Sequence, residues 1–102
     1  MSHSPNYLKI IGVLRSRKTR CVWFKDKRFY GMLDDDTVMI NPNAGEIVST
    51  ICHECLHKIY PDFPEEVIMA MELVVMKDLT LTQAVEILQI FTRKAKLYER
   101  EP

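Results

Sequence analysis

The residues best suited to chemistry in this chain are two histidines four positions apart, with a glutamate directly after the first. His53, Glu54 and His57 form the pattern H-E-x-x-H. Residues four apart on a helix share one face, so both imidazoles could hold one cation. Zinc favours imidazole ligands and, in catalytic sites, keeps one position open for water. Glu54 is rotated by roughly 100° from His53 on a helix. It could therefore take a proton from zinc-bound water as general base.

A third protein ligand is expected on the segment that follows. Glu65 and Glu72 fall on one side of a helix because seven residues make about two turns, whereas Glu66 falls toward solvent. We favour Glu65 as the metal ligand, since a tight turn through Pro61 would bring it back beside His57. Glu72 is the alternative ligand, or an acceptor for an imidazole N–H. A helix-capping role for Glu65 also remains open.

The same segment contains a second metal-binding pattern, Cys52-x-x-Cys55. Together with His57 and Cys21 it could form a structural zinc knuckle, which usually places the two cysteines on a turn. The surrounding residues instead predict a continuous helix with both cysteines on its apolar side, where they would act as small core residues. An odd number of cysteines without a secretion signal indicates reduced thiols in a cytoplasmic protein. For His53 and His57, the alternative to a zinc site is a pair of surface histidines that bind no metal.

The elements that would position these residues begin with strands. Residues 1–6 read as a loose tail, and the apolar, partly β-branched segments Tyr7–Leu14 and Thr19–Lys25 predict two antiparallel strands. Arg28–Met32 would extend the sheet, and Leu33–Asp36 would form a turn. Thr37–Ile40 predicts a short strand that stops at an Asn-Pro pair.

Three helices are expected after the strands. Asn43–Glu46 has the form of a capping box, and the helix that it opens should run to about residue 58. A second helix should begin with Asp62 as its N-cap and continue to about residue 77. A third should span Thr82–Tyr98, capped by Thr80 or Thr82. The order predicts one α+β domain over residues 1–102. Its three-stranded, mostly antiparallel sheet would be covered on one face by the H-E-x-x-H helix, the glutamate helix and the C-terminal helix.

Charge and hydropathy exclude several classes of partner. Lys plus Arg and Asp plus Glu both number 14, so net charge gives no reason to expect nucleic acid. The basic run Arg15–Arg20 is interpreted as a solvated turn. No apolar run approaches the ~20 residues of a membrane span. We therefore expect no nucleic-acid and no membrane partner, while a homodimer is compatible with the sequence.

These residues resemble the zincin metallopeptidases, whose zinc helix carries H-E-x-x-H. The stretch "HECLHKIYPDFPEE", with a glutamate on the following helix, is similar to the gluzincin type, and the chain length resembles minimal single-domain gluzincins. The resemblance covers about Thr37–Leu73. It implies that His53, His57 and Glu65 bind zinc and that Glu54 is the catalytic base and acid. It also implies that Thr37–Ile40 is an edge strand that pairs with an extended peptide substrate.

The implied function is that of a zinc-dependent peptidase, a hydrolase of peptide bonds. A latent form is one hypothesis, in which the tails Met1–Asn6 and Glu99–Pro102 cover the site. For the residue that stabilises the oxyanion, the sequence offers only Tyr60 and Tyr98 as guesses. The alternative function is a catalytically silent, zincin-like zinc-binding module that binds a partner protein through the aromatic region Trp23–Tyr30.

Overall fold

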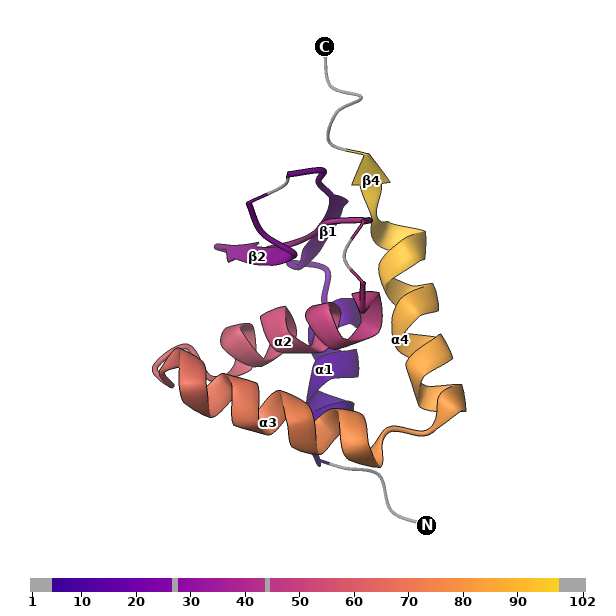
Figure 1. The fold of residues 1–102 in the computed structure, drawn as a ribbon. Helices are drawn as coiled ribbons and strands as arrows, with labels where there is room; N and C mark the ends of the chain where they lie inside the picture. Colours follow the sequence, from indigo (N-terminus) through magenta and orange to yellow (C-terminus); the bar gives the residue numbers. More distant parts are fainter. Residues whose placement is uncertain (1–4, 27, 44, 98–102) are drawn as a thin grey trace.

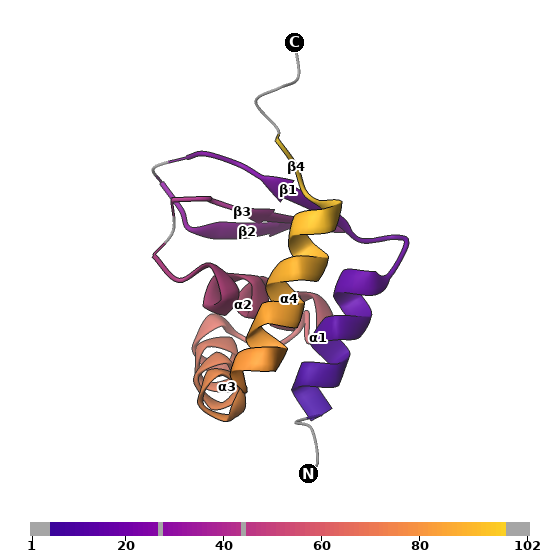
Figure 2. The ribbon, with the colours of Figure 1, turned by 90° about the vertical axis from the view of Figure 1, so that its right-hand side faces the viewer.

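The computed structural model describes residues 5–26, 28–43 and 45–97, which form an α+β fold with a sheet on one side and helices on the other (Figures 1 and 2). This confirms the predicted fold class. Along the chain the elements are α1 (Pro5–Arg15), β1 (Arg20–Trp23), β2 (Gly31–Asp34), β3 (Thr37–Ile40), α2 (Ile47–Ile59), α3 (Glu65–Asp78), α4 (Leu81–Lys94) and β4 (Lys96–Leu97).

The sheet is mixed, with the strand order β2-β3-β1-β4. β2 and β3 form an antiparallel hairpin, whereas β1 runs parallel to both β3 and β4. The prediction of a mostly antiparallel sheet was therefore wrong. The hairpin turn is shorter than the expected Leu33–Asp36, because β2 continues to Asp34. Asp35 has a φ of 57°, a left-handed conformation that aspartate tolerates better than most residues.

The first predicted strand is wrong: Tyr7–Leu14 lies inside helix α1, which already begins at Pro5. Within α1 the buried side chains are Tyr7, Ile10, Ile11 and Leu14, at the i, i+3, i+4, i+7 spacing of one helix face. A short apolar run of this kind fits a strand or a helix equally well by composition. The helical conformation is selected because it lets one face enter the core while Leu8 stays 55% exposed.

The second and third expected strands lie close to their predicted positions. β1 falls within Thr19–Lys25, and β3 has the predicted bounds Thr37–Ile40. The strand predicted at residues 28–32 is shifted to Gly31–Asp34.

The helix starts differ from the predicted caps. α2 begins after Glu46, and α3 after Pro64, with no side-chain cap hydrogen bond at either position. The capping box at Asn43–Glu46 and the N-cap at Asp62 were therefore wrong. Thr80 does cap α4, with the reciprocal capping box completed by Gln83. α4 ends at residue 94, before the predicted end. None of the described helices is long and apolar enough to cross a membrane.

The core lies between the sheet and helices α1, α2 and α4 (Figure 2). Its largest fully buried side chain is Phe91 of α4, whose ring meets the edge of Trp23 at a centroid distance of 4.9 Å. All three cysteines are buried and free of disulfides, which confirms the predicted core position of Cys52 and Cys55. This packing fixes α2 beneath the sheet, with one face inward and the opposite face turned toward α3.

Candidate metal centre

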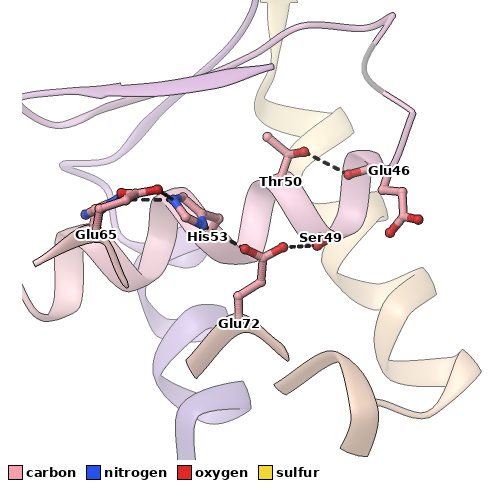
Figure 3. A network of polar contacts seen from close by, with 7 residues as sticks. Glu46, Ser49, Thr50, His53, Glu65 and Glu72 are labelled. Carbon is pink, nitrogen blue, oxygen red and sulfur yellow. Dashed lines mark hydrogen bonds and ion pairs between the residues drawn. The ribbon is translucent and has the colours of Figure 1, made fainter. Parts of the chain in front are cut away.

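Helix α2 separates its core residues from its polar ones by face. Ile51, Cys52, Cys55 and Leu56 are all 0% exposed, whereas the side chains of His53 and His57 keep partial access to solvent. Burial of the apolar face sets the rotation of the helix about its axis. That rotation turns His53 toward Glu65 and Glu72 of α3, which follows α2 after a tight turn (Figure 3). The imidazole of His57 also reaches Glu65.

Three side chains converge at this place: His53, His57 and Glu65. The two carboxylate oxygens of Glu65 lie 2.9 Å from His53 Nε2 and 2.8 Å from His57 Nε2, and the two Nε2 atoms lie 3.2 Å apart. Donor atoms that share a tetrahedral zinc ion lie about 3.3 Å from one another, because Zn–N bonds measure about 2.0–2.1 Å. The observed spacing therefore suits one small cation held by the predicted ligand set.

Glu72 lies behind His53 and not beside Glu65 (Figure 3). Its Oε1 is 2.7 Å from His53 Nδ1, and its other oxygen accepts a hydrogen bond from the hydroxyl of Ser49. A carboxylate that accepts from Nδ1–H fixes the ring and directs the lone pair of Nε2 outward. The geometry thus separates the two alternatives, with Glu65 beside the ligand atoms and Glu72 behind one imidazole.

Glu65 lies on the open part of its helix. Its side chain is 57% exposed, and Met69, four residues later, is 52% exposed. Glu65 is held by the two imidazoles and does not cap its own helix, where Pro64 occupies the N-cap. On α3, Ile68 and Val75 are fully buried, and Met71 and Met76 are partly buried against the core.

The titration of two site residues is shifted by their surroundings. Burial alone would lower the pKa of His53, but the hydrogen bond to Glu72 and the charges of Glu54 and Glu65 outweigh it, so that the pKa is raised. Burial raises the pKa of Glu54, whose side chain is only 8% exposed, against the opposing effect of the two imidazoles. A carboxyl with a raised pKa is better suited to exchange protons near neutral pH.

The site opens into a cavity of about 490 Å³ between α2 and strand β2. His53, Glu54, His57 and Glu65 line one side, and Gly31 with the next two residues of β2 lines the other. A smaller cavity of about 280 Å³ continues past Tyr30 and Thr50 toward Glu72. Glu54 borders both cavities, so its carboxylate stands where a molecule bound between the ligands and β2 would meet it.

Gly31 is required by the close approach of β2 to α2. A Cβ atom at this position would lie 2.5 Å from Thr50 Cγ2 and 3.2 Å from a carboxylate oxygen of Glu54. Any larger residue would push the strand away from the helix. The absence of a side chain therefore sets the width of the cavity.

The strand next to the site is β2, not β3. The resemblance implied that Thr37–Ile40 is an edge strand, but β3 lies inside the sheet between β2 and β1, and this implication was wrong. β2 forms one edge of the sheet and lines the cavity with Gly31, Met32 and Leu33. Its outer side, which no strand among the described residues pairs with, can accept another extended chain.

Asn41 is a site-supporting residue that sequence reasoning missed. It is 7% exposed, and its Nδ2 donates to the backbone carbonyls of Asp26 and Phe29, at 2.7 Å and 3.2 Å. Its backbone N–H donates to the carbonyl of Tyr30 at 2.7 Å. These bonds hold the loop that leads into β2 and so position Tyr30 and Gly31 at the cavity. The only sequence signal was an Asn-Pro pair, which predicts no such contacts.

Other residues considered from the sequence lie elsewhere. Tyr60 donates to Asn6 Oδ1, stacks on Phe63 and lines neither cavity, so it does not face the site. Tyr98, which was the other guess, lies outside the described residues. Cys52 and Cys55 are in the core, and among the described residues the one metal-compatible cluster excludes them.

Comparisons with known proteins do not assign the chain to a family. No family model matches the chain, and neither the search of curated proteins nor that of solved structures gives a match.

Proposed function

We propose that this chain is a zinc-dependent peptidase of the H-E-x-x-H type, which resembles a minimal gluzincin. The observation that carries the proposal is the convergence of His53 Nε2, His57 Nε2 and a Glu65 oxygen at the spacing of a tetrahedral ligand set. Three protein ligands leave one position open, which is the arrangement of catalytic rather than structural zinc. When bound, zinc supplies Lewis acidity, which polarises a carbonyl and acidifies water.

The residues of the chain then have separate tasks. Glu54, buried beside the two imidazoles with a raised pKa, accepts a proton at its carboxylate and returns it to the leaving amine. Glu72 holds the Nδ1 proton of His53 and so keeps Nε2 directed at the ligand position. Gly31 keeps the cavity wall close to Glu54.

The substrate in this proposal is an extended peptide. The free edge of β2 lies along the cavity, so a peptide added there would run past Glu54 and the metal ligands. Backbone hydrogen bonds of strand addition do not depend on side chains, which suits a protease that recognises an extended conformation first. Met32 and Leu33 would provide the apolar contacts. This proposal moves the predicted pairing strand from β3 to β2.

Two measurements test the proposal in order. Purified protein should take up one equivalent of Zn²⁺ at neutral pH, and His53→Ala and His57→Ala should each abolish that uptake. Glu54→Gln should keep zinc and lose hydrolysis of an unstructured protein such as casein, because it removes the base and leaves the ligands. Zinc uptake that survives loss of both imidazoles would overturn the metal site. Full hydrolysis by Glu54→Gln would overturn the role of Glu54.

The competing function is a silent zinc-binding module. It is favoured by the 70% exposure of Tyr30 at the mouth of the smaller cavity, since an exposed aromatic side chain is typical of protein-binding surfaces. Such a module would bind zinc but release no peptides from a library digest, whether or not Glu54 is present. Both functions fit a cytoplasmic setting, which the three buried, unpaired thiols support.

A further inference from the structure

The outer face of α3 carries an apolar stripe that the metal site does not use. Its residues are Met69, Ala70, Leu73 and Val74, and the three larger side chains are 52%, 71% and 58% exposed. With roughly 100° of rotation per residue, all four lie on the side opposite buried Ile68 and Val75. Figure 2 shows α3 end-on, with α2 on one side and its outer side uncovered by any other described element.

The stripe ends in opposite charges. Glu66 lies one turn before it and Lys77 one turn after it, and both side chains are exposed. Among the described residues neither of the two has an ion-pair partner. Glu66, Ala70, Leu73 and Lys77 lie almost on one line along the helix, because their spacing of four, three and four residues follows the helical period.

This pattern is complementary to itself when reversed. In an antiparallel pair of α3 helices with its two-fold axis midway between Ala70 and Leu73, Glu66 faces Lys77 of the second copy at each end. The small Ala70 faces the large Leu73 of the second copy, which lets the helices approach closely. Met69 and Val74 flank this line on its two sides. Two-fold interfaces of this kind use the same patch on both subunits.

We propose that the outer face of α3 is a homodimer interface, in which two copies of this chain pair their α3 helices antiparallel through Leu73 and Ala70, with Glu66–Lys77 ion pairs at both ends. The zero net charge of the chain favours self-association, because no overall repulsion opposes it. One helix per subunit forms a small interface, so a reversible dimer is expected rather than a permanent one. The proposal does not depend on zinc binding.

Analytical ultracentrifugation over a range of protein concentrations tests the interface. The wild-type chain should show a monomer–dimer equilibrium, and Leu73→Glu should weaken the dimer at least about tenfold, because it places a charge at the apolar centre. Leu8→Glu is the matched control, since Leu8 is a 55% exposed leucine on α1 and its replacement should leave the equilibrium unchanged. Wild-type protein that stays monomeric throughout, or Leu73→Glu protein that dimerises normally, would overturn the proposal.

Charge exchange tests the antiparallel register. Glu66→Lys and Lys77→Glu should each weaken the homodimer, because each places like charges opposite one another at both ends. A mixture of these two variants should recover association as a heterodimer, in which every end pair again has opposite charges. Circular dichroism checks that α3 remains helical in both, since the changes oppose the helix dipole. If the mixture associates no better than either variant alone, the register is wrong.

Discussion

The hydrogen bond from His53 Nδ1 to Glu72 gives the sharpest test of the site. Replacing Glu72 with Ala removes an acceptor 2.7 Å from the imidazole, in a contact whose side chains are only 14% and 21% exposed. A hydrogen bond to a charged group contributes about 1.5–3 kcal/mol. Loss of such a support for a metal-binding histidine lowers affinity about 10–100-fold, or about 1.4–2.7 kcal/mol. The free energy of the hydrogen bond and the expected loss of zinc affinity therefore agree.

Competition with a zinc chelator measures the change directly. Glu72→Ala should lower zinc affinity by about 10–100-fold. Glu65→Ala should lower it further, because it removes a proposed ligand. Glu66→Gln is the matched control, since Glu66 is the neighbouring acid on the solvent side of α3. If the loss is larger for Glu72→Ala than for Glu65→Ala, the assignment of ligand and supporting residue is reversed. If Glu72→Ala binds zinc as tightly as the wild type, the supporting role is refuted.

A second readout needs no metal. The pKa of His53 is raised in the folded protein despite its burial, in part by Glu72, so protonated His53 stabilises the metal-free fold below the ordinary histidine pKa of about 6.5. This stabilisation is lost as pH rises through the raised pKa. The difference in Tm between wild type and Glu72→Gln should therefore be larger at pH 5.5 than at pH 8, both without zinc. An equal difference at the two pH values would show that the carboxylate does not act on the imidazole.

Three further predictions concern the packing around the site. Gly31→Ala should destabilise the fold by about 1–3 kcal/mol in urea denaturation, and Thr50→Ser should recover part of this loss, because it removes the methyl group that the new Cβ meets. A double variant no more stable than Gly31→Ala would contradict the contact. Asn41→Ala should cost about 1–3 kcal/mol and raise proteolysis of the loop before β2, since two half-buried carbonyls lose their donor; an unchanged cleavage rate would argue against this role. Burial raises the pKa of Cys21 to about 11 and that of Cys52 to about 12. Iodoacetamide at pH 8 should therefore leave all three thiols of the native protein unmodified and alkylate all three in urea, and rapid native labelling would show that the core is open.

Sequence reasoning succeeded where local spacing carries the information. Two histidines four residues apart lie on one face of any helix, so the pairing of His53 and His57 needed no tertiary structure. The helical period also placed Cys52 and Cys55 in the core. Thr80 and Thr82 were both predicted as possible caps of the last helix, and the structure places the cap at Thr80.

Sequence reasoning failed where a local pattern fits two conformations or where the structure depends on contacts between distant residues. Tyr7–Leu14 is apolar enough for either a strand or a helix, and only its packing against α2 and α4 favours the helix. The sheet order could not be predicted, because it depends on which strands meet across the fold. For this reason the strand nearest the site was taken to be β3, whereas the edge strand β2 lies there.

The sequence by itself determined the chemistry that the site can hold: two imidazoles and a neighbouring carboxylate on one helix, since a regular helix fixes their relative positions. Only the tertiary structure decided which glutamate stands beside those imidazoles and which behind them. Glu65 and Glu72 lie seven residues apart on one face of α3, and the packing of α3 against α2 places Glu65 at the Nε2 atoms of both imidazoles and Glu72 at Nδ1 of His53. It also decided that Gly31 and Asn41 shape the cavity, because both act through contacts with residues remote in the chain.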